Sequence, residues 1–405
     1  MLAACSAPPP DELPGPPASA AHFAIECPDR GVRAFDSSRT LIEGVPIDCT
    51  VRVGQRTGEA LAGKAVSVLV EAGRFTIDPA TSAEGKTALH LETDMPLPLE
   101  VDAGVFTWSP PIDATHTGEY LAPLWMEPFR WTEVPTIPTP NFSLREPRRP
   151  DPLRLKPDGT RFENNPRDNL VTIVAWTEGE ERFVDNNGNG TFDTGELFTD
   201  LTEPFVDADD DGTRGPQEEF VDTNGNGQWD GKNGQWDART KIWAQQRVLW
   251  TGIPAEQDMQ RTVMGVTGHR PTLGGFSAIN LRCPTATTMC SSAGSEELTL
   301  SMSDPWFNRL AHQGEDDGCS FSSTPLVVVS PPIVALNGRL ELHRSDTWPA
   351  VYFYSGLTIT DARTAATPVR SPAEMFTVSI VCDLSASRGQ PPERFVFDAI
   401  RGTID

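Results

Sequence analysis

The chain has 405 residues, which is enough for two or three domains, and 38% of them are hydrophobic. With 37 prolines and 33 glycines, it should contain few long amphipathic helices and many short strands. The formal net charge of −24 argues against a nucleic-acid partner and against binding to an anionic membrane surface. The sequence has no apolar stretch long enough for a transmembrane helix.

The first residues, MLAAC, match the bacterial lipobox, in which small residues precede a cysteine that becomes lipidated. The other interpretation is a chance alanine-rich start. A proline-rich stretch, residues 6–20, follows as a tether would. We therefore expect residues 1–21 to be a lipobox remnant with a tether, and Cys5 to be the lipidation site. The protein would then be lipid-anchored at the cell outer membrane, or extracellular or periplasmic, and Cys5 would be its sole membrane contact.

Strand signals begin after the tether. Ile47, Cys49, Val51 and Val53 alternate with polar residues, which predicts a strand with one buried face. Residues 66–70 and 89–91 predict two more strands at the spacing of a β-sandwich. The stretch VRVGQRTGEALAGKAVSVLVEAGRFTIDPATSAEGKTALHLET resembles bacterial Ig-like domains of the invasin/intimin type, in its valine strands and its Thr-x-x-x-Gly turn before a strand. This resemblance covers residues 40–105 and implies an Ig-like sandwich.

Residues 106–168 are proline-rich, and we expect an irregular crossing there. Within it REPRRPDPLRLKP is a basic patch, which could pair with acidic residues or a polyanionic glycan, although a solvated crossing is the preferred interpretation. The runs NLVTIVAWTEGEE and KIWAQQRVLWTG then predict two strands of the same sandwich. They flank an acidic insertion at 183–238, so we expect one domain over 22–254.

A second Ig-like sandwich is expected over 255–405, with strands near 277–283, 298–302, 376–382 and 395–397. Besides Cys5, an even number of cysteines suggests disulfides, and six allow 15 pairings. If Cys27 pairs with Cys49, three pairings remain for the last four. The Ig resemblance favours Cys283–Cys382, which leaves Cys290 with Cys319. The pairing of Cys283 with Cys290 and of Cys319 with Cys382 is nearly as plausible.

The acidic insertion contains the spacing of calcium loops. An EF-hand loop has oxygen ligands at positions 1, 3, 5, 7 and 9, a glycine at 6 and a bidentate glutamate at 12. The first predicted loop meets all of these requirements with Asp185, Asn187, Asn189, Gly190, Thr191, Asp193 and Glu196. A hard cation needs such a set of oxygen ligands.

Two further loops follow the first. The second has ligands Asp207, Asp209, Asp211, Thr213 and Glu218, with Gly215 at position 9, where water would bind. The third has ligands Asp222, Asn224, Asn226, Gln228 and Asp230. Its position 12 is Asn233, which offers one neutral oxygen, and Asp237 could substitute if the loop is distorted. Carboxylate number and rigidity predict decreasing affinity from the first loop to the third.

Phe-Val-Asp recurs before each loop, at residues 183–185, 205–207 and 220–222, and we expect the three phenylalanines to form a small stacked core. The half-repeat Asn-Gly-Gln-Trp-Asp occurs at 226–230 and 233–237. The alternative for this segment is a solvated acidic linker, since charge runs are commonly disordered. The ligand spacing and the periodic aromatic residues favour Ca²⁺, and without a cation the segment should unfold through self-repulsion.

The expected fold is therefore all-β, with two Ig-like β-sandwiches, the first of which carries the calcium-loop insertion. No His-x-x-x-His and no Gly-x-Ser-x-Gly motif occurs, and we expect no enzyme. The leading hypothesis is a calcium-binding surface lipoprotein that acts as a structural or adhesive Ig-like spacer, with an unknown protein or glycan partner. The alternative is a glycan- or protein-binding module, accessory to a secreted hydrolase or surface complex, that uses Trp229, Trp236 and Trp243. Packing around the loops is the preferred role for these tryptophans.

Overall fold

The computed structural model describes residues 16–28, 31–99, 150–163, 169–208, 212–253, 259–263, 266–269, 279–284, 288–302, 304–306, 318–330, 333–334, 352–386 and 389–405. The strands in its first half are β1 (Ala18–Ser19), β2 (Phe23–Glu26), β3 (Gly31–Arg33), β4 (Pro46–Val53), β5 (Ser67–Val70), β6 (Arg74–Ile77), β7 (Lys86–Glu92), β8 (Pro150–Leu155), β9 (Arg161–Glu163), β10 (Leu170–Glu180) and β11 (Thr240–Thr251). A 3-10 turn, η1 (Ala20–His22), follows β1.

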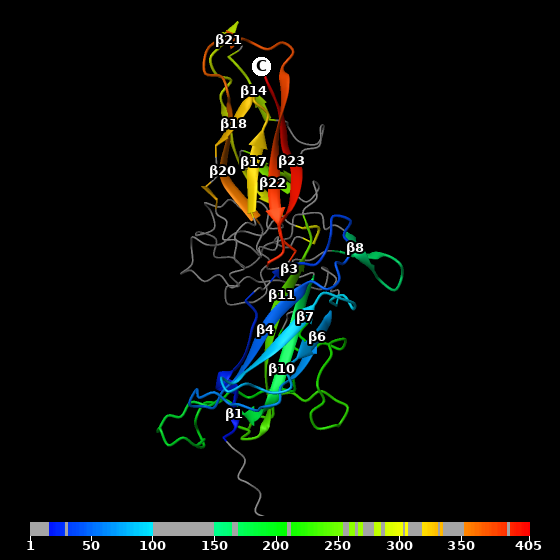
Figure 1. The fold of residues 1–405 in the computed structure, drawn as a ribbon, viewed down its shortest axis with the longest axis vertical. Coiled ribbons are helices and arrows are strands. Elements are labelled where there is room, and N and C mark those ends of the chain that lie inside the picture. Colours follow the sequence, from blue (N-terminus) through cyan, green and yellow to red (C-terminus); the bar gives the residue numbers. More distant parts are fainter. Residues whose placement is uncertain are drawn as a thin grey trace, which may run out of the picture.

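The strands in the second half are β12 (Met259–Val263), β13 (Val266–His269), β14 (Ile279–Leu281), β15 (Met289–Cys290), β16 (Ser295–Met302), β17 (Gly318–Ser323), β18 (Val327–Ser330), β19 (Ile333–Val334), β20 (Tyr352–Asp361), β21 (Thr367–Pro368), β22 (Glu374–Leu384) and β23 (Glu393–Ile404). The predicted all-β fold is confirmed. Figure 1 shows two strand-rich modules that follow one another along the long axis of the molecule.

The first module is a sandwich of two sheets. One sheet has the order β1-β10-β11-β3, with β5 also paired to β10, and the other has the order β2-β4-β7-β6. Along β4, the side chains of Ile47, Cys49, Val51 and Val53 are buried and those between them are more exposed, as the alternation predicted. They pack in one core with Ile173 of β10, among other residues. Hydrophobic burial on the inner faces therefore holds the two sheets together.

β10 and β11 are antiparallel partners over a long register, from Leu170 opposite Leu249 to Gly179 opposite Thr240. The acidic insertion connects their ends, as the sequence predicted. The near-continuous burial of β10 reflects its central place, because β1 and β5 pair with its other edge. The insertion is thus anchored to the centre of a sheet.

The predicted tether ends earlier than expected. Ala18 and Ser19 form β1, which pairs in parallel with Gly179 and Glu180 of β10, and Ala18 is fully buried. A Cβ atom at Gly179 would lie 2.4 Å from the carbonyl oxygen of Ala18, so this close approach requires glycine. Residues 150–163 also differ from the expected irregular crossing, because β8 and β9 pair there. Cys5 and residues 106–149 lie outside the described residues.

The second module again contains two sheets. One has the order β13-β12-β16-β20-β18 with β19 on β20, and the other has the order β14-β23-β22-β17. On β22, the side chains of Phe376, Val378, Ile380 and Cys382 are buried on one face, as predicted. They belong to a second hydrophobic core, separate from that of the first module.

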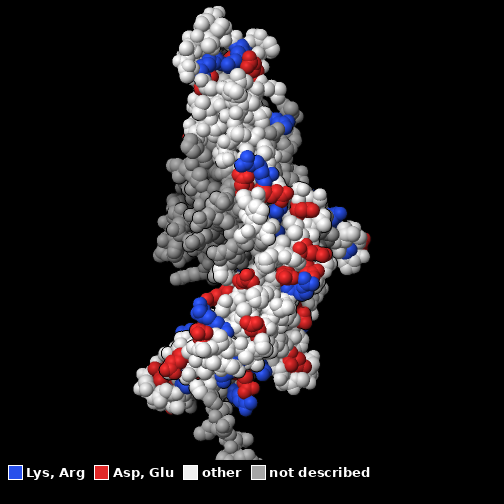
Figure 2. Space-filling view, in the orientation of Figure 1, with Lys and Arg blue, Asp and Glu red and all other residues white. Residues whose placement is uncertain are grey.

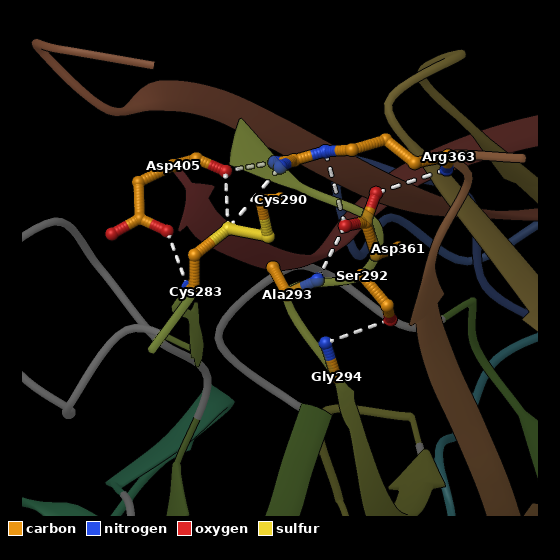
Figure 3. Close-up of a disulfide and its surroundings, with 8 residues drawn as sticks. All are labelled: Cys283, Cys290, Ser292, Ala293, Gly294, Asp361, Arg363 and Asp405. Carbon is orange, nitrogen blue, oxygen red and sulfur yellow. Dashed lines mark hydrogen bonds and ion pairs between the residues drawn. A yellow bond between two sulfur atoms is a disulfide. The ribbon is translucent and has the colours of Figure 1, made fainter. Parts of the chain in front are cut away.

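The structure decides between the disulfide alternatives. Cys27–Cys49, the pairing assumed in the sequence analysis, is present, but the favoured Cys283–Cys382 bridge is wrong because Cys283 bonds to Cys290 (Figure 3). Cys283 lies two residues after the end of β14 and Cys290 lies in β15, so the bond closes a short loop. Cys382 is also disulfide-bonded, and its backbone lies opposite Cys319 in the register of β17 and β22.

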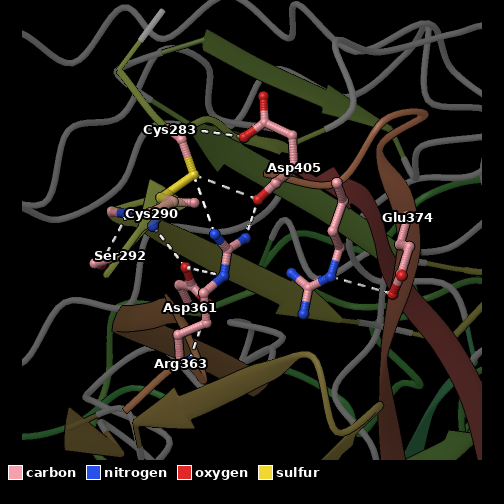
Figure 4. A network of polar contacts seen from close by, with 10 residues as sticks. Cys283, Cys290, Ser292, Asp361, Arg363, Glu374 and Asp405 are labelled. Carbon is pink, nitrogen blue, oxygen red and sulfur yellow. Dashed lines mark hydrogen bonds and ion pairs between the residues drawn. A yellow bond between two sulfur atoms is a disulfide. The ribbon is translucent and has the colours of Figure 1, made fainter. Parts of the chain in front are cut away.

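A buried arginine organises the loop around this disulfide. The Nε atom of Arg363 lies 3.1 Å from Oδ2 of Asp361, and its Nη1 donates to Sγ of Cys283 at 3.2 Å. Its Nη2 donates to the carbonyl oxygen of Asp405, and Figure 4 shows these contacts as one network. The buried ion pair therefore joins the end of β20 to the disulfide and to the residue after β23.

The two modules also touch through specific side chains. Trp306, which follows β16, is fully buried in the core of the first module, and its ring centroid lies 4.6 Å from that of Phe35. Arg33 of β3 forms an ion pair with Glu393 of β23 at 2.8 Å. The packing of Trp306 against Phe35 and one ion pair thus connect the two modules.

Candidate cation-binding loops

The candidate site is the insertion between β10 and β11. Residues 183–237 contain fourteen Asp or Glu residues, against Arg214 and Lys232. Acidic side chains lie on the surface at the lower end of the molecule in Figure 2, where Figure 1 places the green loops. Within the described residues, no three His, Cys, Asp or Glu side chains are grouped closely enough to hold a metal ion by themselves.

The first loop is organised by its first and last carboxylates. The carboxylate of Asp185 accepts hydrogen bonds from the backbone N–H groups of Gly188, Asn189 and Gly190 at 2.7, 3.2 and 2.8 Å. The carboxylate of Glu196 accepts from the N–H groups of Asn186 and Asp193, at 2.8 and 3.0 Å. The loop therefore holds both of its predicted end ligands in fixed positions.

The amide side chains of the same loop converge on one aspartate. Asn187 and Asn189 each donate through Nδ2 to Oδ2 of Asp193 at 2.7 Å. Oδ1 of Asn189 accepts from both the N–H and the hydroxyl of Thr191. Positions 1, 3, 5, 9 and 12 of the predicted motif are thus linked in one compact polar network.

The aspartates at position 1 of the first and third predicted loops have lowered pKa values. The pKa of Asp185 lies below its ordinary value, chiefly because the N–H of Gly190 donates to its carboxylate. The pKa of Asp222 is lowered in the same way, chiefly by the N–H of Gly227. Hydrogen bonds to the ionised form favour it, so both carboxylates stay charged at neutral pH.

The third loop repeats the geometry of the first. Asp222 accepts from the N–H groups of Gly225, Asn226 and Gly227, and Nδ2 of both Asn224 and Asn226 donates to Oδ2 of Asp230. The N–H of Gln228 donates to Oδ1 of Asn226, as Thr191 does to Asn189. The two loops share the pattern Asp-x-Asn-Gly-Asn-Gly-x-x-Asp and adopt the same arrangement up to position 9.

In the second loop, the structure describes the contacts of the first and last predicted ligands, Asp207 and Glu218. The carboxylate of Glu218 accepts from the N–H groups of Ala208 and Gly215, at 2.7 and 2.6 Å. Oδ2 of Asp207 accepts from the N–H of Gly212 and from Arg247 of β11. Oδ1 of Asp207 is buried and has no hydrogen-bond partner among the residues that the structure describes. A buried carboxylate oxygen without a donor is costly and leaves a lone pair for a cation. Asp209 and Asp211 lie outside the described residues.

The structure places Asn233 and Asp237 away from the third loop. The N–H of Asn233 donates to Oδ1 of Asp200, and its Nδ2 donates to Oδ2 of Asp237. The N–H of Asp237 donates to Oε2 of Glu181 at 3.0 Å. The half-repeat therefore forms a further polar cluster with residues from outside the three predicted loops.

Glu203 occupies the end of the third loop instead. Its carboxylate accepts from the N–H groups of Thr223 and Asp230, at 2.7 and 3.0 Å. Sequence reasoning did not select Glu203, Glu181 or Asp200. The missed signal is the unit Glu-x-Phe-Val/Thr-Asp, which occurs at 181–185, 196–200, 203–207 and 218–222.

The phenylalanines of these units do not form the single stacked core that was predicted. Phe183 pairs by backbone with Phe198, and Phe205 pairs with Phe220. Phe183 packs against Phe192 and Trp236, whereas Phe205 packs against Trp229 and Trp243. The aromatic residues therefore form two clusters, one around Phe183 and one around Phe205.

The three tryptophans point their indole nitrogens into the protein. Nε1 of Trp229, Trp236 and Trp243 donates to the backbone carbonyls of Glu203, Glu181 and Thr202, respectively. All three are half-buried. This arrangement is the packing role that the sequence analysis preferred.

No family model matches this sequence, and no curated protein is similar to it in sequence. Among solved structures, the chain is similar to FdeC, an Escherichia coli adhesin, with a TM-score of 0.28 and 11% identity over 95% of this chain and 64% of that chain. It is also similar to the Yersinia pseudotuberculosis adhesin InvE, with a TM-score of 0.21 and 7% identity over 97% of this chain and 62% of that one. This chain thus spans less than two thirds of either adhesin, and similarity at these scores establishes neither a family nor a function.

Proposed function

We propose that this chain is a non-catalytic, calcium-binding protein of the cell surface or extracellular space, in which two β-sandwiches act as a structural or adhesive spacer. Ca²⁺ would stiffen the insertion between β10 and β11. The observation that carries the proposal is the position-by-position agreement of the polar contacts in the first and third loops. It is supported by Oδ1 of Asp207 in the second loop, which is buried and has no hydrogen-bond partner within the described part of the chain.

The donor set suits a hard cation. Carboxylates and Asn amides carry the oxygen ligands that Ca²⁺ prefers, and position 7 would contribute a backbone carbonyl. The glycines at position 6, Gly190, Gly212 and Gly227, have φ between 76° and 78°, as the sharp turn of such loops requires. When bound, Ca²⁺ would neutralise carboxylates that otherwise repel one another.

A spacer role is supported by the shape and internal links of the molecule. The modules follow one another along its long axis, and Trp306 and the Arg33–Glu393 pair span their junction. Disulfides in both modules suit an oxidising compartment. Among the described residues, no helix combines the length and apolarity that a membrane span requires. A lipid anchor at Cys5 remains part of this proposal, as does an unidentified protein or glycan partner.

Calorimetric titration with Ca²⁺ and hydrogen exchange with and without a chelator test this proposal. We expect calcium binding, and chelation should reduce protection in residues 183–237 while β4, β7 and β22 stay protected. Titration with Mg²⁺ is the control, because that ion demands a smaller, stricter octahedral site. Equal protection of the insertion in both states, together with no heat of binding, would refute the proposal.

A further inference from the structure

Four glutamates of the insertion make the same pair of contacts. Glu196 and Glu218 each accept from the N–H groups at positions 2 and 9 of their own loops, at 2.6–3.0 Å. Glu203 accepts from Thr223 and Asp230, which are positions 2 and 9 of the third loop. Since Glu203 lies upstream of that loop, its carboxylate reaches the closing position from a different segment.

Glu181 makes the same pair of contacts with a loop whose residues come from two separate segments of the chain. Its carboxylate accepts from the N–H of Leu201 at 2.7 Å and from that of Asp237 at 3.0 Å. Leu201 follows Asp200, and the carboxylate of Asp200 accepts from the N–H groups of Asn233 and Gly234. These contacts match those that Asp185 makes with Asn189 and Gly190. Asp200 therefore occupies position 1, and Asn233 and Gly234 occupy positions 5 and 6.

The remaining positions agree as well. Nδ2 of Asn233 donates to Asp237 at 2.8 Å, as Asn189 does to Asp193 at 2.7 Å. Gly234 has a φ of 76°, the same as Gly190. The chain between residues 201 and 233 contains the second and third loops. One pair of loops is thus inserted within the last loop of another pair.

Burial and charge favour a bound cation at these two glutamates. Glu181 is 1% exposed and Glu203 is 7% exposed, and within the described residues the hydrogen-bond donors to both carboxylates are backbone N–H groups and the Thr223 hydroxyl, with no basic side chain among them. Around Glu181, the neighbouring charges of Asp237 and Asp200 are also negative. A buried charge without a countercharge is strongly unfavourable, so such a cluster of anions is stable when a cation joins it.

We propose that Glu203 supplies the closing carboxylate of the third loop, and that Glu181 closes a fourth Ca²⁺ site made by Asp200, Asn233 and Asp237. This inference rests on the proposed calcium binding. The fourth site is discontinuous in sequence and holds its three segments together, so Ca²⁺ there fastens the base of the whole insertion. The expected capacity is four ions per chain, one for each Glu-x-Phe-Val/Thr-Asp unit.

The test compares Glu203→Gln and Glu181→Gln in the full chain, with Glu219→Gln as the matched control. Glu219 is exposed and adjacent to Glu218, and its backbone carbonyl accepts a hydrogen bond from the N–H of Val206. Calorimetry should show about one site lost, or weakened at least tenfold, in each of the first two variants and no change in the control. Glu203→Asp, which keeps the charge but shortens its reach, should weaken the same site as Glu203→Gln.

Hydrogen exchange assigns the loss to a loop. Glu203→Gln should remove calcium-dependent protection from residues 222–230 and leave 233–237 protected, and Glu181→Gln should do the reverse. Protection of β10 and β11 reports that each variant is folded. If the wild type binds Ca²⁺ but both variants bind as it does, this inference is wrong and the proposed function stands. If the wild type binds no Ca²⁺, both fail.

Discussion

Asp207, at the start of the second loop, forms a buried ion pair with Arg247 of β11, with 2.8 Å between Oδ2 and Nη2. Both side chains are almost inaccessible to solvent. The hydroxyl of Thr172 in β10 donates to the carbonyl oxygen of the same aspartate. Asp207 therefore links the insertion to both strands that carry it, through a pair of charges in a low-dielectric environment.

We predict that Asp207→Asn destabilises the first module by about 3–5 kcal/mol, because the buried guanidinium of Arg247 would lose the negative charge of the Asp207 carboxylate. Chemical denaturation in the presence of chelator measures this without a contribution from calcium. Glu218→Gln is the control, since the carboxylate of Glu218 accepts hydrogen bonds from backbone N–H groups of the loop. A similar loss of stability in both variants would contradict the assignment to the ion pair.

Glu196→Gln should weaken the tightest calcium site more than Asn233→Ala weakens any site. Glu196 would supply two anionic oxygens at position 12, whereas Asn233 offers one neutral oxygen. Calorimetric titration of the two variants against the wild type decides between them. A larger loss for Asn233→Ala would contradict this difference between a bidentate carboxylate and a single amide oxygen.

Alkylation under non-reducing, denaturing conditions should modify none of the six cysteines downstream of Cys5. Cys27, Cys49, Cys283, Cys290 and Cys382 are disulfide-bonded in the structure. Mass spectrometry before and after reduction counts the free thiols. Six alkylated cysteines in protein from an oxidising compartment would contradict the disulfide framework.

Replacing both Cys27 and Cys49 by alanine should destabilise the first module by about 3 kcal/mol, because their bond closes a loop with a sequence separation of 22 residues. Urea denaturation monitored by fluorescence measures the change. Cys283→Ala combined with Cys290→Ala is the comparison, since that bond spans a separation of 7 residues and restricts the unfolded chain less. A larger loss in the shorter loop would argue against this entropic explanation.

The ion pair between Glu178 and Arg239, where the insertion leaves β10 and returns to β11, should make stability depend on pH. The pKa of Glu178 lies below its ordinary value of 4.5, chiefly because the guanidinium of Arg239 donates to it at 2.6 Å. Its stabilising contribution is therefore complete above pH 4.5 and is lost as the pH falls through the lowered pKa. Both groups are substantially exposed, so the pair contributes roughly 0.2–1 kcal/mol.

Arg239→Gln should raise the pKa of Glu178 toward 4.5, and an NMR titration of its side-chain carboxyl carbon checks this. Lys241, whose Nζ lies 3.9 Å from the same carboxylate, should have the smaller effect when changed to Gln. Equal shifts in both variants would show that general surface charge, rather than the short Arg239 contact, sets the pKa.

Local patterns in the sequence were sufficient for much of the fold. The alternation at Ile47–Val53 identified β4 because a strand with one buried face needs period-two hydrophobicity. The apolar runs around Val171 and Val248 identified β10 and β11, and the spacing from Asp185 to Glu196 identified a loop whose contacts are local. Each of these features depends on residues that are close in sequence, so one stretch contains the whole signal.

The tertiary structure decided the contacts between distant segments. Spacing alone gave Asn233 the twelfth position of the third loop, but backbone pairing of Phe205 with Phe220 brings Glu203 there instead. The partner of Cys283 likewise depended on where β14 and β15 lie, and not on resemblance to a sheet-to-sheet bridge. The predicted tether is shorter than expected because Ala18 is buried against β10. Gly179 leaves room for this strand, and no local pattern around residue 18 predicts it. The sequence thus determined what each segment can form, and the packing of distant segments determined which residues complete each site.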